Sequence, residues 1–175
     1  MVEAQTGGSS SAILHDFNFA AAGDWGCSSN TNNTVRSMQS KNSELILGLG
    51  DYIYNDDSAD SWLEIVKPLD DKIKIAIGNH ETGTILTELM DHFGLTEQYY
   101  SFDYQNVHFI AMSSELPWIK SSAQYKFVKD DLAKASRDPD INWIVIFHHD
   151  LAYTSPSVKR IESSLRDTYH PLFDQ

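Results

Sequence analysis

The sequence has 175 residues, the size of one ordinary domain. Hydrophobic residues make up 41% and charged residues 22%, a balance typical of a globular protein with a substantial core. Thirteen Lys and Arg against 25 Asp and Glu give a net charge of −12, which argues against nucleic acid or an anionic membrane surface as a partner, because both attract clustered cations. A single cysteine, Cys27, excludes an internal disulfide and a four-cysteine zinc site. No apolar stretch approaches the roughly 20 residues of a membrane span.

The first half of the sequence alternates apolar runs with helical patterns. Residues 1–11 are polar and rich in Gly and Ser, which predicts a disordered N-terminal tether ahead of a single domain at 12–175. Three apolar runs predict strands, and helical spacing predicts a helix after each: strands at 17–22, 44–49 and 73–77, and helices at 34–40, 62–69 and 85–93.

The second half begins with two β-prone runs separated by Gln105-Asn106, which predict a hairpin over 99–104 and 107–112. Ser121-x-x-Gln124 is a weak capping-box signal for a helix that follows. Residues 143–147 predict a further strand, and Ser155-Pro156 is typical of the start of a last helix.

Polar side chains stand directly after four of the predicted strands. These positions are Asp24, Asp51, Asn79-His80 and His148-His149, and a glycine directly precedes each of the first three: Gly23, Gly50 and Gly78. The first three positions lie roughly 30 residues apart, about the length of a strand–helix–strand unit. Because right-handed crossovers make such strands parallel, their carboxyl ends share one edge of a sheet. The sequence therefore predicts that these polar side chains converge.

The residue types at these strand ends are those of a metal site. Carboxylate and amide oxygens together with imidazole nitrogens suit Fe, Mn or Zn, and Asp51 is the central candidate for a bridging ligand. For any single Asp or Asn, a turn after a strand is the ordinary explanation, but the whole set favours the metal site. At the fourth strand end, His148 is the favoured ligand and His149 the alternative.

The same positions carry a family resemblance. It rests on four motifs in order: Gly23-Asp24-Trp25-Gly26, Gly50-Asp51-Tyr52-Ile53-Tyr54, Gly78-Asn79-His80-Glu81 and the strand end at His148. Together they resemble the calcineurin-like metallophosphoesterases. The resemblance is closer to the purple-acid-phosphatase branch, because Gly26 replaces the histidine usual in the first motif and Tyr54 stands three residues after Asp51.

The resemblance implies a role for each motif residue. Asp24 and Tyr54 would bind a first metal, Asp51 would bridge, and Asn79 and His148 would bind a second; His80 would act on the phosphoryl group or the leaving oxygen, and Asn79, His80 and His149 would contact substrate. The metals implied are two ions, Fe plus Fe, Zn or Mn. The fold implied is α/β, a β-sandwich flanked by helices. The activity implied is hydrolysis of small phosphate esters, mainly monoesters, by a hydroxide generated at the dinuclear centre.

One family motif does not occur. The last motif of the family is Gly-His-x-His, and the sequence holds no Gly-His pair, so we expect a domain truncated at its C-terminus with weakly occupied or empty metal sites. Two other functions stay open: a phosphodiesterase or nuclease of the same superfamily, and a non-catalytic interaction module on this fold. Protein partners are not indicated, and the resemblance favours an extracytoplasmic location.

Overall fold

The computed structural model describes residues 17–153 and 163–174. Its elements in chain order are β1 (Phe19–Ala22), α1 (Ser29–Ser40), β2 (Leu45–Gly48), α2 (Ala59–Val66), the 3-10 helix η1 (Lys67–Leu69), β3 (Ile73–Ile75), α3 (Gly83–His92), β4 (Tyr100–Tyr104), β5 (Val107–Ala111), α4 (Ala123–Ala135), β6 (Trp143–Phe147) and α5 (Ser163–Phe173). The predicted tether at 1–11 and the predicted helix start at Ser155-Pro156 lie outside the described residues.

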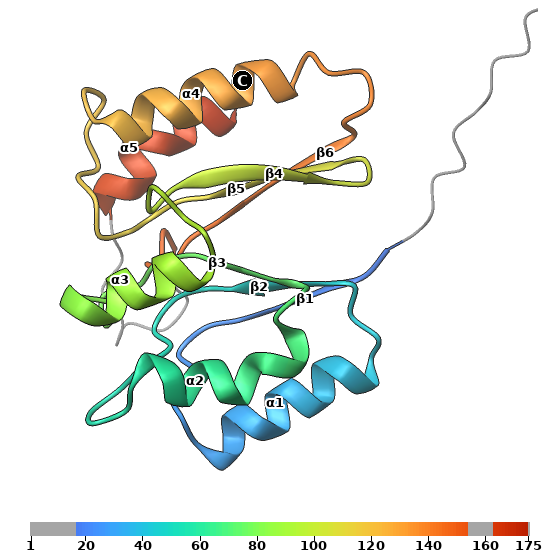
Figure 1. The fold of residues 1–175 in the computed structure, drawn as a ribbon. Coiled ribbons are helices and arrows are strands. Elements are labelled where there is room, and N and C mark those ends of the chain that lie inside the picture. Colours follow the sequence, from blue (N-terminus) through green and yellow to red (C-terminus); the bar gives the residue numbers. More distant parts are fainter. Residues whose placement is uncertain (1–16, 154–162, 175) are drawn as a thin grey trace, which may run out of the picture.

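The strands form two sheets that lie face to face between helices. The first sheet has the order β1-β2-β3 with all strands parallel, and the second has the order β4-β5-β6, antiparallel between β4 and β5 and parallel between β5 and β6. Figure 1 shows α1 and α2 on the outer side of the first sheet, and α4 and α5 on the outer side of the second. The predicted class, a β-sandwich flanked by helices, is confirmed.

Side-chain alternation along the strands fills three layers of core. On β2, Ile46 faces the helices of the first half, whereas Leu45 and Leu47 face the other sheet. On β6, Val145 and Phe147 face the first sheet, whereas Ile144 and Ile146 pack toward α4 and α5. Because successive strand residues point to opposite faces, β6 is apolar on both sides.

The predicted shared edge of one sheet is corrected by this topology. Only β1, β2 and β3 belong to one sheet, and β6 is an edge strand of the other among the described strands. The strand ends nevertheless lie close together, because the two sheets face each other and the ring of His149 bonds across to the first sheet: its Nδ1 lies 2.8 Å from the carbonyl oxygen of Leu49. Convergence therefore needs both sheets rather than one.

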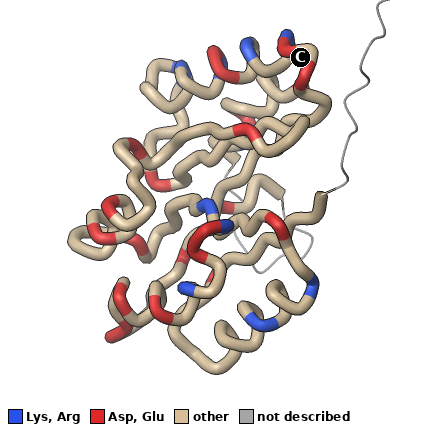
Figure 2. Tube along the Cα trace, turned by 45° about the vertical axis from the view of Figure 1, so that its right-hand side comes forward, with Lys and Arg blue, Asp and Glu red and all other residues tan. Residues whose placement is uncertain are grey.

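The surface is acidic over both halves of the molecule, and Figure 2 shows Asp and Glu positions on helices and loops throughout. Within the described ranges, the helices are too short or too polar to cross a membrane.

Candidate metal centre

Asp51 is the centre of the candidate site. It follows β2 through Gly50 and is only 4% exposed. Its Oδ1 accepts a hydrogen bond from the backbone N–H of His80 at 3.0 Å. Its Oδ2 faces three other side chains: the Tyr54 hydroxyl at 3.2 Å, His149 Nε2 at 3.3 Å and His80 Nε2 at 3.8 Å. One oxygen is thus anchored, and the other points to the place where the site residues meet.

Asp24 and Tyr54 complete one side of the site. The Tyr54 hydroxyl lies 3.1 Å from Asp24 Oδ1 as well as 3.2 Å from Asp51 Oδ2. A phenol carries one proton, so it can donate to only one of these carboxylates at a time. The phenol oxygen then faces the oxygen of the other carboxylate with no proton between them. Partial burial, followed by the charge of Asp51, raises the pKa of the Tyr54 hydroxyl well above its usual range. A cation at this point would remove both the repulsion and the excess of lone pairs.

At the fourth strand end, His149 and not His148 lies beside Asp51 and Asn79. The structure differs here from the favoured prediction, and strand alternation is the reason: His149 continues the face of Val145 and Phe147, which looks toward the first sheet. His148 lies on the opposite face, its Nδ1 is buried without a hydrogen-bond partner, and burial lowers its pKa. The alternative left open by the sequence is therefore the one that the geometry favours.

The His149 ring is oriented as a metal ligand would be. Its Nδ1 must carry a proton, because the Leu49 carbonyl can only accept. In the neutral ring Nε2 then carries a lone pair and no proton, yet it faces two other acceptor atoms, Asn79 Oδ1 at 3.2 Å and Asp51 Oδ2 at 3.3 Å. A ligating histidine commonly donates its second N–H to a backbone carbonyl in this way. With the ring neutral, three acceptor atoms from three loops therefore face one point.

His80 lies beside this set without joining it. Its ring lies against that of Tyr54, with the centroids 4.3 Å apart, and its side chain is 40% exposed. The site opens into a cavity of about 520 Å³ that brings together seven polar side chains and one leucine, namely Asp24, Asp51, Tyr54, Asn79, His80, His149, Asp150 and Leu151. All the predicted site residues except His148 line it.

Backbone hydrogen bonds tie the site loops to one another. The N–H of Asp24 donates to the Gly50 carbonyl at 3.1 Å, and the N–H of Trp25 donates to the Asp51 carbonyl at 2.7 Å. Glu81 belongs to the third motif but is not among the site residues that the sequence predicts. The structure buries its carboxylate between the loops after β2 and β3. Burial raises its pKa, and three backbone N–H groups oppose that rise.

The residues present fit metal ions. One group of donors would be Asp24, Asp51 and Tyr54, and a second Asp51, Asn79 and His149, both sets of oxygen and nitrogen atoms suited to Fe, Mn or Zn. Over residues 17–153 and 163–174, no cluster of three or more His, Cys, Asp and Glu has the arrangement of a metal site. Tyr54 and Asn79, which would supply one donor to each group, are not among these four residue types.

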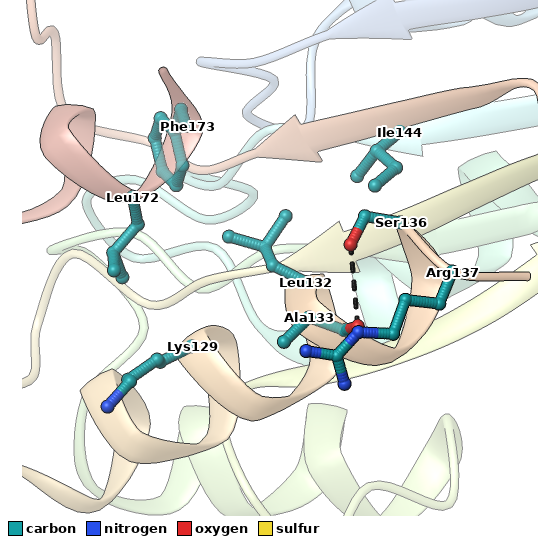
Figure 3. Close-up of a pocket in the computed structure, with 8 residues that line it drawn as sticks. All are labelled: Lys129, Leu132, Ala133, Ser136, Arg137, Ile144, Leu172 and Phe173. Carbon is teal, nitrogen blue, oxygen red and sulfur yellow. Dashed lines mark hydrogen bonds between the residues drawn. The ribbon is translucent and has the colours of Figure 1, made fainter. Parts of the chain in front are cut away.

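Two other features carry less chemistry. Burial and the neighbouring Asp57 raise the pKa of Cys27 to about 11, so its thiol is protonated at neutral pH. A second hollow of about 310 Å³ lies between α4, β6 and α5 (Figure 3). Its floor is apolar, with Leu132, Ile144 and Phe173, and the described residues that line it include no His, Asp, Glu or Cys.

Fold and site together define a two-sheet α/β protein with a candidate metal-ligand set at its strand ends. The chain belongs to the calcineurin-like phosphoesterase family, whose model matches residues 17–171. It is 30% identical to purple acid phosphatase 22 of Arabidopsis thaliana over 88% of this chain and 40% of the relative. It is also 30% identical to purple acid phosphatase 18 of the same plant, over 74% of this chain and 34% of that protein. The predicted resemblance to this branch is confirmed.

A solved structure has the same fold. It is a purple acid phosphatase isolated from yellow lupin (Lupinus luteus) seeds, with a TM-score of 0.76 and 19% identity over 90% of this chain and 35% of that one. The chain thus spans between a third and two fifths of the length of the relatives it matches.

Proposed function

We propose that this chain carries the metal centre of a phosphatase that hydrolyses phosphate esters, chiefly monoesters. The observation that carries the proposal is that the Tyr54 hydroxyl and His149 Nε2 both lie close to Asp51 Oδ2. Asp51 and Tyr54 follow the first sheet and His149 follows the second, so lone pairs from both sheets meet at one place. Family membership supports the reaction class, since the matching family model is that of calcineurin-like phosphoesterases.

The proposed metal positions share Asp51. Asp24 and Tyr54 would complete the first, where a phenolate favours ferric iron, and Asn79 and His149 would complete the second, which suits Fe, Zn or Mn. Bound there, two cations would lower the pKa of a coordinated water and neutralise charge on the phosphoryl oxygens.

The protein's own residues orient the reaction. Asp51 is held by the His80 N–H, and His149 by the Leu49 carbonyl, so neither side chain needs to reorganise. The His80 ring is open to the cavity and lies near the anchored carboxylate. It is placed to hydrogen-bond the phosphoryl group or to give a proton to the leaving oxygen, the role that a general acid plays in ester cleavage.

The cavity favours a small monoester over a nucleic-acid strand. Neither Lys nor Arg is among the described residues that line it, so this described lining offers no cationic track for neighbouring phosphates. The net charge of −12 acts in the same direction. An extracytoplasmic location stays a prediction from the resemblance.

The test is a metal titration with p-nitrophenyl phosphate and its bis ester. We expect monoester hydrolysis that depends on added Fe, Mn or Zn and that falls by at least about a hundredfold in Asp51→Asn, which loses the shared ligand. Asp91→Asn, an exposed position on α3, is the matched control and should keep the wild-type rate. Faster turnover of the bis ester would favour a phosphodiesterase, and no turnover of either ester despite metal uptake would favour a non-catalytic module.

A further inference from the structure

We propose that Glu81 is a positioning residue of the metal centre: its buried carboxylate fixes the loop that carries Asp51 against the loop that carries Asn79 and His80. The metal-binding part of this inference rests on the proposed function. The link that Glu81 makes between the two loops rests on hydrogen bonds and packing that the structure shows.

Three backbone N–H groups converge on the Glu81 carboxylate. Its Oε2 accepts from Asp51 at 2.8 Å and from Gly78 at 2.9 Å, and its Oε1 accepts from Tyr52 at 2.8 Å. Asp51 and Tyr52 follow β2, whereas Gly78 follows β3. A single carboxylate therefore joins two loops that adjacent parallel strands would otherwise only bring near each other.

The burial of Glu81 is costly for a contact that served stability alone. The residue is 1% exposed, and none of the ion pairs in the described part of the chain involves it. A buried carboxylate without a counter-ion is tolerated only where hydrogen bonds replace its hydration. Here all three hydrogen bonds to the carboxylate come from the loops after β2 and β3, so the buried charge fixes the position of one loop relative to the other.

The loops after β2 and β3 are packed so closely that neither Gly50 nor Gly78 has room for a side chain. A Cβ added at Gly78 would lie 2.5 Å from Asp51 Oδ1 and 2.7 Å from Asp51 N. A Cβ at Gly50 would lie 2.9 Å from Gly78 and 2.8 Å from the Cβ of His149. The loops after β2 and β3 thus touch backbone to backbone with the side chain of His149 against both, and Glu81 holds the two loops in that contact.

Any shift of these two loops relative to each other would move the proposed ligands directly. Asp51 is one residue from Gly50, Asn79 is one residue from Gly78, and His149 contacts both loops. Residues behind a ligand set commonly change metal affinity by about 10- to 100-fold when they are removed. We expect Glu81 to belong to that class.

The decisive variant is Glu81→Gln. An amide offers one acceptor oxygen and one NH2 group, so in either orientation the NH2 faces at least one backbone N–H and that bond is lost. In the metal-free protein, amide hydrogen exchange at Asp51, Tyr52 and Gly78 should accelerate more than at the core strands. In calorimetric titrations, Mn²⁺ or Zn²⁺ should bind about 10- to 100-fold more weakly. Gly78→Ala, which separates the same loops by steric overlap, should shift affinity in the same direction.

Two control variants separate positioning from general destabilisation. Tyr100→Phe removes a half-buried hydroxyl that bonds to Ile75, away from the site, and should lower the free energy of unfolding without changing metal affinity. Glu88→Gln changes an exposed glutamate on α3 and should alter neither. Wild-type affinity in Glu81→Gln, a loss no larger than in Tyr100→Phe, or a wild-type chain that takes up no metal would overturn the inference. A wild-type chain that binds metal without hydrolysing esters would instead refute the proposed function and leave the role of Glu81 standing.

Discussion

Two aspartates of the candidate metal centre have backbone conformations that residues other than glycine rarely adopt. The φ angles of Asp24 and Asp51 are 53° and 56°, in the left-handed region. Such conformations cost on the order of 1 kcal/mol or more and persist where the surroundings enforce them, often at functional sites. Backbone bonds between the loops after β1 and β2 enforce them here, so both carboxylates are aimed at the site before any ligand arrives.

The two neighbouring histidines after β6 should respond differently to substitution. His149→Ala removes a proposed ligand and should weaken Mn²⁺ or Zn²⁺ binding at least about tenfold. His148→Leu should leave metal affinity unchanged and keep or raise stability, because it removes a buried nitrogen without a partner. Calorimetric metal titrations and urea unfolding of both variants check this. Loss of metal binding in His148→Leu with retention in His149→Ala would restore the ligand first predicted from the sequence.

At the scale of elements, His108 joins two strands to a helix. Its Nδ1 lies 2.6 Å from Asp103 Oδ1 on β4, and its Nε2 lies 2.8 Å from Asp131 Oδ2 on α4. Burial alone would lower the pKa of His108, but the hydrogen bonds and charges of Asp131 and Asp103 outweigh it and raise the pKa above its usual value. The ring is thus most useful to the fold when both nitrogens are protonated.

This contact should make stability depend on pH. A histidine whose pKa is higher in the folded than in the unfolded chain contributes fully below the unfolded value, near 6.5, and loses that contribution as pH rises through the folded value. The destabilisation caused by His108→Gln should therefore be larger at pH 5.5 than at pH 9, by about 1–3 kcal/mol. Urea unfolding at the two pH values measures it.

The matched control is another His–Asp pair. His92 lies 2.7 Å from Asp70, but both side chains are exposed by a third or more, so His92→Gln should change stability by less than about 1 kcal/mol at either pH. An effect of His108→Gln that stays constant between pH 5.5 and pH 9 would contradict the role given to the doubly bonded ring.

The sequence predicts the elements well where local signals suffice. The hairpin of β4 and β5 and the strand β6 lie within a residue of their predicted bounds, because turn residues and β-prone runs are local. The cap of α4 is Ser122 rather than Ser121, since the Gln124 expected in a capping box instead bonds to the backbone of Ser113, in the segment between β5 and α4. The choice between His148 and His149 depended on which face of β6 meets the first sheet, which an apolar run cannot show.

The division into two sheets and the role of Glu81 needed the three-dimensional structure for a similar reason. Both depend on contacts between segments about 30 to 100 residues apart, such as Glu81 with Asp51 and His149 with Leu49. Residue types at single positions carry the ligand chemistry, but pairing between distant loops is decided by packing of the whole core.

At the scale of the whole molecule, the candidate metal centre is a junction between the two sheets. Asp24, Asp51 and Asn79 come from loops of the first sheet and His149 from the second, so a bound ion would link both halves. Without an ion, the same place holds two carboxylates around a single phenol proton, which opposes folding through repulsion. Metal binding should therefore stabilise the chain globally and not only at the site.

Thermal unfolding with and without metal tests this linkage. An ion at 100 times its dissociation constant stabilises by about 2.7 kcal/mol, which for a domain of this size raises Tm by about 5–10 °C, and EDTA should reverse the rise. Asp51→Asn should lack the rise, yet without metal it should be at least as stable as wild type, because an amide relieves the repulsion and can still accept the His80 N–H through its oxygen. An equal rise in Asp51→Asn would place the stabilising ion elsewhere, and a less stable metal-free variant would show that the charge of Asp51 supports the fold itself.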